Sequence, residues 1–444
     1  MRTPVQLLRI ALPLVATALS CSDITNLEQK DPSQILSKDV YVPEQAALLV
    51  NGAVGDFECA FFRYVTAAGL LGDELVNVIA NTANYNYDRR TNPLTGSYAG
   101  GCNTIQQPGV YTSLSVARAS ADTVLARLEG WTDAQMPAGV SRTQLIGKAA
   151  AYAGYSLVLL GEGFCTAAIN VGPELTPTQV FTEAEGRFDQ AITAAGAAGD
   201  TTTLNLARVG RARTLLNLAF AATPTDSTDP DPALLAAAAA DAALVPAGFV
   251  VTAVASATGT TRQQNVVFAH TGVGIGTANY SSVDASFDSV RFAGVLDPRV
   301  RVINTGQVGA NGVPIRQQTK YANLGAAAPI ARTAEAQLIV AEAAILTGDR
   351  GTAVNIINAL HAAAGIPAYD STGQTNAQVL TQVRDERKVE LFLESHRLGD
   401  TRRLSRDLVP PIGTPFPGGG TYGDQRCFPL PAVERNNNPN IPDV

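Results

Sequence analysis

Residues 385–404 read DERKVELFLESHRLGDTRRL, a stretch in which acidic, basic and apolar residues are interleaved at helical spacing. On a helix, Glu386 and Glu390 share a stripe with Val379 and Val383, so carboxylates lie on faces that apolar residues would bury. Buried carboxylates must be paired, and the arginines of the same stretch are the available partners. The stretch therefore predicts a packed helix with an internal network of structural ion pairs, formed by Glu386, Arg387, Glu390, Glu394, Arg397, Arg402 and Arg403.

A catalytic pair of carboxylates is the alternative interpretation of these acidic residues. A working acid and base need environments that hold their pKa values apart. Here arginines flank every acidic residue of the stretch and would keep all of them ionised. The pattern therefore favours a structural role over catalysis.

The stretch resembles the C-terminal signature of the SusD/RagB family of outer-membrane nutrient-binding lipoproteins, which reads E-R, E-L, E-G-x-R, an acid and a further arginine. Ser395 stands where that family usually has a glycine, which leaves the local turn open. Upstream, residues 332–343 fit the family pattern R-x-x-E-x-x-L-x-x-A-E-A. Lys320-Tyr321 and residues 428–431 also fit family landmarks, so the resemblance covers most of the chain.

The N-terminus predicts an export signal. Arg2 and Arg9 accompany an apolar run over residues 10–19 that is too short to span a membrane, and Cys21 follows it closely. Residues 18–21 read ALSC, which is similar to the lipobox of bacterial lipoproteins, and the family resemblance implies lipidation at Cys21. We expect a signal peptide over 1–20, a lipidated tether over 21–42 and a single domain over 43–444, held at the surface of the outer membrane. A soluble secreted protein with Cys21 as an ordinary thiol is the alternative.

Charge and cysteine content narrow the function classes. The chain has 32 basic and 39 acidic residues, a balance that opposes binding to nucleic acid. With Cys21 assigned to lipid, four cysteines remain for one or two disulfides in an oxidising compartment, and the sequence leaves their connectivity open. The three histidines lie far apart in the sequence, so we expect neither a metal site nor a cofactor. The four cysteines are Cys59, Cys102, Cys165 and Cys427.

Alanine-rich helix pairs are expected to form the scaffold over residues 43–76, 110–244 and 331–408. Residues 145–161 followed by 178–195 have the same build as residues 332–348 followed by 351–364, which is a helix, a glycine turn and a second helix. The second unit is close to the ~34-residue period of a tetratricopeptide repeat. The sequence thus predicts a mainly α fold in which tetratricopeptide-like pairs form a right-handed superhelix, with irregular loops and short β-hairpins inserted.

Three segments without helical period interrupt or follow this scaffold, at residues 77–109, 245–330 and 409–444. We expect the first to be a long loop and the second to contain edge strands or hairpins, for instance over residues 265–270. The helix over residues 43–71 is expected to be interrupted around Gly52 to Asp56. Such insertions are where binding residues tend to lie.

The loop at residues 77–109 has the side chains of a sugar-binding surface. Pyranose C–H groups stack on aromatic faces, while amides and charged groups bind the hydroxyls. The family resemblance also implies a binding loop just before the helix that begins at Tyr111. Alternatively, the tyrosines only pack the loop against the scaffold, which is also the role expected for Trp131. The predicted ligand-binding residues are Tyr85, Asn86, Tyr87, Arg89, Tyr98, Asn103 and, from the second insertion, Tyr280.

The resemblance implies a non-catalytic lipoprotein that captures a nutrient and delivers it to a SusC-like TonB-dependent β-barrel transporter. The cargo would be an oligosaccharide or, as a variation within the family, an oligopeptide. Two alternatives stay open, a secreted hydrolase that uses carboxylates and a repeat module that binds peptides or proteins. Turnover of a polysaccharide would favour the first, and isolation without a β-barrel partner would favour the second.

Overall fold

The computed structural model describes residues 37–221, 228–273 and 279–442, with side chains from residue 39 onward. The chain divides into two units, one that ends at Val42 and one that begins at Pro43. The described part of the first unit holds one short helix, α1 (Ser37–Val40). The predicted signal peptide and Cys21 lie outside the described residues.

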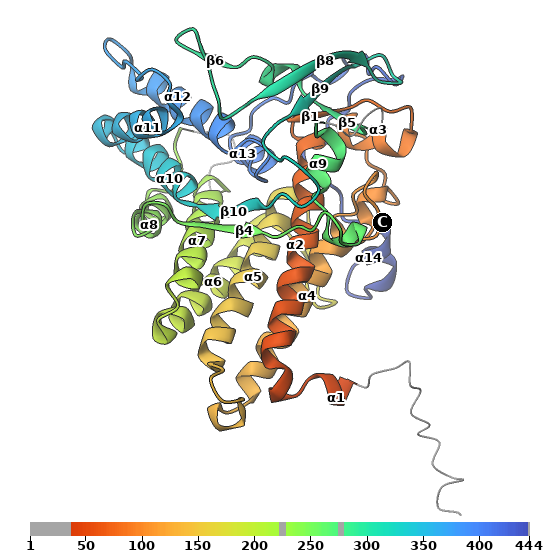
Figure 1. Cartoon of the computed structure of the whole chain (residues 1–444), viewed down its shortest axis with the longest axis vertical. Coiled ribbons are helices and arrows are strands. Elements are labelled where there is room, and N and C mark those ends of the chain that lie inside the picture. Colours follow the sequence, from red (N-terminus) through yellow and green to blue (C-terminus); the bar gives the residue numbers. More distant parts are fainter. Residues whose placement is uncertain (1–36, 222–227, 274–278, 443–444) are drawn as a thin grey trace, which may run out of the picture. The chain divides into compact units, whose positions relative to one another are not determined.

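The second unit is mainly α, which confirms the predicted fold class (Figure 1). Its long helices lie side by side, and each packs against the next along the chain. Helix α8 then packs against α10, so the stack continues across the strand-rich insertion. The helices of this stack are α2 (Ala46–Leu71), α4 (Tyr111–Gly130), α5 (Arg142–Gly163), α6 (Pro177–Ala198), α7 (Thr201–Ala221), α8 (Pro232–Ala243), α10 (Thr333–Leu346), α11 (Arg350–Ala364) and α12 (Asn376–Glu390).

Local sequence explains how these helix pairs begin and how closely they pack. Thr176 and Gln179 form a capping box at the start of α6, with Pro177 in the first turn. Phe188 of α6 fits between Gly154 of α5 and Gly210 of α7, where a Cβ atom would come within 2.8 and 2.3 Å of the ring. The predicted pairs are α5 with α6 and α10 with α11, as the two units of the internal repeat require.

Two local predictions are wrong. Helix α2 runs without interruption through Gly52 and Gly55, because burial of neighbours such as Val50 and Phe57 outweighs the weak helix propensity of glycine. Residues expected to form a strand near 265–270 instead form helix α9 (Val266–Thr271), whose N-terminus is capped by the Asn265 side chain.

Short antiparallel pairs occupy the insertions. The described strands form two-stranded ladders, in which β1 pairs with β5, β2 with β3, β4 with β10, β6 with β7 and β8 with β9. The segment 77–109 is not loop throughout, because it contains helix α3 (Thr82–Asp88). The strands are β1 (Leu75–Asn77), β2 (Ala167–Ala168), β3 (Glu174–Leu175), β4 (Val250–Ala253), β5 (Ser281–Val283), β6 (Arg291–Phe292), β7 (Val295–Leu296), β8 (Val302–Val308), β9 (Pro314–Gln318) and β10 (Ala328–Arg332).

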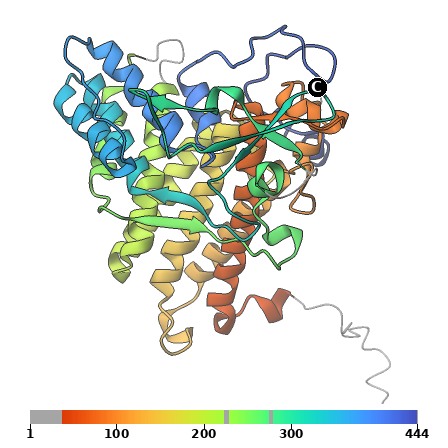
Figure 2. The same ribbon diagram turned by 45° about the horizontal axis from the view of Figure 1, so that its top comes forward.

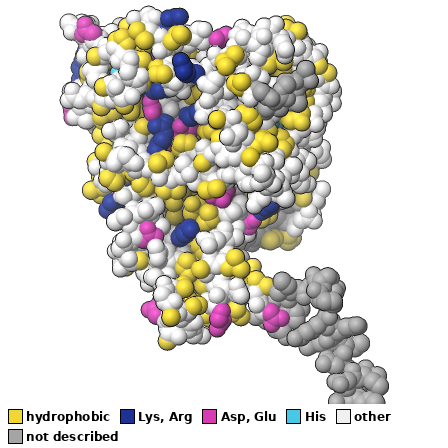
Figure 3. Space-filling view, viewed as in Figure 1, with side chains coloured by type: hydrophobic (Ala, Val, Ile, Leu, Met, Phe, Trp, Pro, Cys, Tyr) yellow, Lys and Arg dark blue, Asp and Glu magenta, His cyan; other side chains and the backbone are white. Residues whose placement is uncertain are grey.

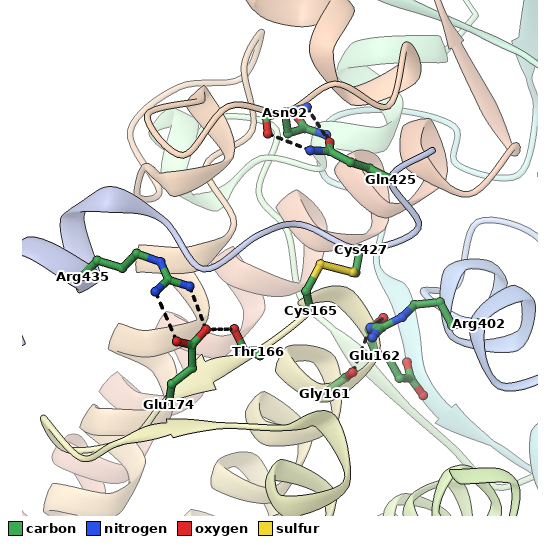
Figure 4. Close-up of a disulfide and its surroundings, with 10 residues drawn as sticks. All are labelled: Asn92, Gly161, Glu162, Cys165, Thr166, Glu174, Arg402, Gln425, Cys427 and Arg435. Atoms are coloured by element: carbon green, nitrogen blue, oxygen red, sulfur yellow. Dashed lines mark hydrogen bonds and ion pairs between the residues drawn. A yellow bond between two sulfur atoms is a disulfide. The ribbon is translucent and has the colours of Figure 1, made fainter. Parts of the chain in front are cut away.

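The C-terminal tail follows α13 (Arg397–Arg403), contains α14 (Ala432–Asn437) and lies beside the segment that holds α3 (Figure 2). A disulfide between Cys165 and Cys427 fixes it to the end of α5 (Figure 4). Gln425 accepts hydrogen bonds from the backbone and side chain of Asn92. The second disulfide joins Cys59 to Cys102, so the structure selects one of the three connectivities left open by the sequence.

Candidate functional site

The acidic residues of the C-terminal signature are buried in ion pairs. Glu390 accepts hydrogen bonds from Arg332 and Arg299, and Glu394 from Arg332 and Lys320. Glu386 is 3% exposed and lies 2.7 Å from both Arg299 and His361. These partners lie outside the stretch, so the predicted internal pairing of the three glutamates is wrong.

The arginines of the stretch form separate pairs. Arg387 and Arg403 both bind Asp400, while Arg397 binds Asp73 with 2.7 Å between Nε and Oδ1. Arg402 instead donates to the carbonyl oxygens of Gly161 and Glu162. The cations of α13 therefore attach this short helix to its neighbours.

The stretch is not one helix, which corrects a second expectation. Helix α12 ends at Glu390, and Leu393 and Ser395 follow with φ values of 56° and 76°. The left-handed conformation at Ser395 explains why a glycine suits this position of the signature. Here the serine gains one contact in return, because its hydroxyl lies 3.3 Å from Arg213, which also donates to the backbone carbonyl oxygen at 3.0 Å.

Neighbouring arginines lower the pKa values of the buried glutamates Glu390 and Glu342. Burial raises the pKa of Glu390, but Arg332 and Arg299 outweigh it and hold that pKa below its usual value. Burial also opposes ionisation of Glu342, yet Arg403 and Arg384 lower its pKa to about 2. Such ionised, neutralised carboxylates are poor general acids, and this favours bracing over catalysis at the signature.

The loop tyrosines predicted to bind ligand lie mostly inside the molecule. Tyr87 is 1% exposed and donates to the carbonyl oxygen of Pro108. Tyr98 is fully buried and stacks on Phe428 of the tail, with ring centroids 5.3 Å apart. Because a buried ring offers no face to a ligand, the structure favours the packing interpretation for both residues.

Tyr85, Asn86 and Arg89 meet the C-terminal tail. The Tyr85 ring, 7% exposed, packs edge-on against Phe416 at 5.3 Å. The half-buried Arg89 contacts the Asn86 side chain and the carbonyl oxygen of Gly419, and its guanidinium lies 6.0 Å from the Phe416 ring. These residues therefore form a boundary between loop and tail.

The other two predicted residues, Asn103 and Tyr280, are not part of this boundary. Asn103 is exposed, and Tyr280 is half-buried with its ring 5.2 Å from His270. His270 itself lies 2.9 Å from the carbonyl oxygen of Ile105, so Tyr280 lies near the far end of the loop. A ligand-binding role for Asn86, Arg89, Asn103 and Tyr280 stays a prediction.

A cavity of ≈ 260 Å³ opens between the end of α3 and the tail. Arg90 lies at its edge, with its guanidinium 4.8 Å from the Tyr422 ring. Its apolar wall includes Ile412, which is 66% exposed, and its polar groups include Asp424 and Arg426. The sequence prediction missed these residues, although the prolines and glycines of the tail indicated an irregular segment of the kind that carries binding residues.

Two further findings concern the described residues. No group of three or more His, Cys, Asp or Glu side chains among them is arranged to hold a metal ion. None of the described helices combines the length and apolar character needed to cross a membrane.

Comparisons with known proteins bear on the family and the fold. Residues 312–425 match the model of the SusD family, whereas no curated protein matches the chain. A SusD-like carbohydrate-binding protein from Bacteroides vulgatus covers 90% of this chain and 98% of its own, with 16% identity and a TM-score of 0.63. The match to a SusD superfamily protein from Parabacteroides distasonis covers 92% of this chain and 99% of that protein, with 14% identity and a TM-score of 0.65. The match to NanU from B. fragilis covers 93% of this chain and 98% of NanU, with 12% identity and a TM-score of 0.66.

The structural likenesses establish the fold over about nine tenths of the chain. The matched residues 312–425 contain α10 to α13, and with them both sequence patterns and the glutamates of the ion pairs described above, whereas the partners Arg299 and Asp73 precede the match. Residues 312–425 of this chain thus match the SusD family model, and about nine tenths of the chain share the fold of SusD superfamily structures.

Proposed function

We propose that this protein is a non-catalytic lipoprotein of the cell surface that captures a nutrient and passes it to a SusC-like TonB-dependent transporter. An oligosaccharide is the proposed cargo, with an oligopeptide as the variation. The family match supports this proposal, and two structural relatives from Bacteroides vulgatus are described as a SusD-like carbohydrate binding protein and a putative sugar binding protein. Lipidation at Cys21 would hold the protein at the outer membrane.

The observation that carries a binding role is the cavity between α3 and the tail. At ≈ 260 Å³ it lies slightly below the usual range of ligand pockets, so it suits one ring-sized group of a longer chain. It combines an exposed apolar wall at Ile412 with the charged groups of Asp424 and Arg426. Such a mixture can pack against C–H groups and bind hydroxyls, and the neighbouring Asn86 and Arg89 would extend it.

Binding of purified protein to a panel of oligosaccharides and oligopeptides, measured by calorimetry, tests this assignment. Ile412→Ser should weaken binding of the cargo several-fold, because the apolar wall is lost. Leu48→Ser is the matched control, since Leu48 is also 66% exposed but lies in the first turn of α2. An equal effect of both changes would reject the cavity as the binding site.

Catalysis and delivery have their own measurements. Release of shorter sugars from a bound polysaccharide would favour the hydrolase alternative and contradict the proposal.

The lipid anchor is tested by Cys21→Ser, which should move the protein from the membrane fraction to the soluble fraction. Mild detergent extraction of the wild-type protein should recover a large β-barrel with it; recovery of the protein alone under conditions that preserve other membrane complexes would count against delivery.

A further inference from the structure

The hairpin of β8 and β9 leaves one edge open. Strand β9 is covered on its far side by β5, where the backbone N–H of Arg316 donates to the Ser282 hydroxyl at 2.8 Å. Strand β8 pairs with β9 on one side, and no described strand pairs with its other side. An open strand edge is a template on which another extended chain can pair.

The register shows which backbone groups face outward. Asn304 lies opposite Arg316, whose backbone N–H is directed to Ser282 and therefore away from β8. This makes the pair non-hydrogen-bonded, so the N–H and C=O groups of Asn304 face away from β9. By the same alternation Val302 faces outward, while Arg301 faces inward and accepts from the N–H of Thr319. The described part of β8 thus offers two consecutive sets of outward groups, at Val302 and Asn304.

Apolar side chains surround this edge. Leu296, Ile303 and Val308 are 53%, 45% and 64% exposed, which is unusual for three large apolar residues of neighbouring strands. A cavity of ≈ 400 Å³ lies between the β6–β7 hairpin and β8, with Leu296, Val302 and Ile303 in its lining. Figure 3 shows hydrophobic and basic side chains over these hairpins, near the top of the view.

The charge around the edge has the opposite sign to the charge of the whole chain. Residues 288–319 contain four arginines and two aspartates, whereas the chain as a whole has a net charge of −7. Both aspartates are engaged, Asp288 with Arg316 and Asp297 with Arg299. Arg291 and Arg301 are exposed and make no ion pair with any described residue. An acidic partner would complement them.

We propose that the outer edge of β8 binds an extended, acidic segment of a partner protein as an added strand. Backbone pairing with Val302 and Asn304 would supply affinity, and acidic side chains opposite Arg301 and Arg291 would select the partner. An oligosaccharide cannot use these backbone groups as a strand does, so this surface differs in chemistry from the cavity at the tail. The proposal does not depend on what that cavity binds.

A peptide probe tests it. A fluorescein-labelled peptide with the sequence Val-Glu-Val-Glu-Val-Glu should bind the full-length protein, measured by anisotropy, while the matching Val-Lys peptide should bind at least several-fold more weakly. Arg301→Glu should weaken binding of the glutamate peptide by about twofold to fivefold and strengthen binding of the lysine peptide, as expected for exposed charge pairs.

A pair of substitutions at one position separates strand addition from simple adhesion. Asn304→Pro removes the outward N–H, a change that an edge strand tolerates, and should weaken binding by about fivefold or more. Asn304→Ala keeps that N–H and should bind the glutamate peptide as the wild type does. Circular dichroism of both variants establishes that they fold.

Each other outcome overturns the proposal. Equal binding of the two peptides would contradict an acidic partner, and equal affinity of the proline and alanine variants for the glutamate peptide would contradict strand pairing. Absence of binding at millimolar peptide would contradict both parts of the proposal. Self-association that Asn304→Pro abolishes, measured by ultracentrifugation, would assign the edge to a second copy of this chain.

Discussion

Two glutamates of α10 should respond to the same substitution in opposite ways. Glu335 and Glu342 lie seven residues apart on one helix and are 1% and 0% exposed. Glu342 binds Arg403 and Arg384 at 2.8 to 3.0 Å. Neither carboxyl oxygen of Glu335 has a hydrogen-bond partner, and Arg213 and His396 lie 4.0 and 3.7 Å away. Burial lowers the pKa of His396 well below its usual value, so this imidazole does not compensate the carboxylate. The two sites therefore compare a compensated and a poorly compensated buried acid on one scaffold.

The magnitude for Glu342→Gln follows from its pKa. Burial opposes ionisation, but Arg403 and Arg384 lower the pKa from 4.5 to about 2, which corresponds to about 3 kcal/mol of stability at neutral pH. This stability is present above pH 4.5 and is lost as the pH falls towards 2. Glu342→Gln should therefore cost about 3 kcal/mol at pH 7, and the difference from wild type should shrink to about half or less at pH 3.

Glu335→Gln should have the reverse sign. Burial, only partly offset by Arg213 and Arg387, raises the pKa of Glu335 to about 7, so the folded protein binds this proton more tightly than the unfolded chain. The resulting stability is present below pH 4.5 and is lost as the pH rises through 7. The neutral glutamine avoids the cost of the buried charge, so this variant should equal the wild type below about pH 4.5 and exceed it by a growing margin as the pH rises to 7.

Urea unfolding from pH 3 to pH 8, with the disulfides intact, measures both effects. Asp133→Asn is the control, because it breaks the ion pair of Arg142 with a 77% exposed carboxylate and should cost less than about 1 kcal/mol. The reasoning is refuted if Glu342→Gln lies within about 1 kcal/mol of wild type at pH 7, or if both glutamine variants show the same pH dependence.

Other parts of the chain yield three further predictions, each measured as a change in the free energy of unfolding in urea. Tyr87→Ala should lower this free energy by about 3–5 kcal/mol, and Tyr87→Phe, which loses one hydrogen bond, by about 1 kcal/mol. An alanine variant as stable as the wild type would contradict the packing role and favour ligand binding by Tyr87. Ser395→Gly should be more stable than Ser395→Ala by about 1 kcal/mol, because only glycine relieves the positive φ; equal stabilities would contradict this strain. Replacing Cys165 and Cys427 together by serine should cost about 2–5 kcal/mol, and an unchanged midpoint would show that the tail is held by other contacts.

Helix pairs were predictable because their signals are local. Thr176-Pro177 marks the start of α6, and the repeated build of helix, glycine turn and helix appears as α5–α6 and α10–α11. Short apolar runs lack such signals, since residues 265–270 are compatible with either a strand or one and a half helical turns. The hydrogen bond from the Phe268 N–H to the Asn265 side chain decides for the helix, and only the folded chain shows that it forms.

The partners of the buried glutamates could not be predicted from the local sequence. The sequence showed that Glu386 and Glu390 need cations, but Arg299 lies about 90 residues upstream of both, on the chain segment between β7 and β8. Periodicity describes one element at a time and carries no information on which distant element packs against it. For the same reason, the sequence did not indicate that the C-terminal tail forms most of the cavity wall beside residues 77–109.

The proposed cavity and the ion-pair network are therefore built on different parts of the chain. Arg89 and Gly419 meet across 330 residues, and the tail that brings them together is fixed by Cys427 and Gln425 at positions outside the network. Changes at Ile412 or Asp424 should thus alter binding without disturbing α10 to α13, while Glu342→Gln should lower stability and leave the affinity of the folded protein for cargo unchanged. If Glu342→Gln weakened binding in proportion to its loss of stability, under conditions in which the protein is fully folded, cavity and network would be coupled, and the scaffold would take part in recognition.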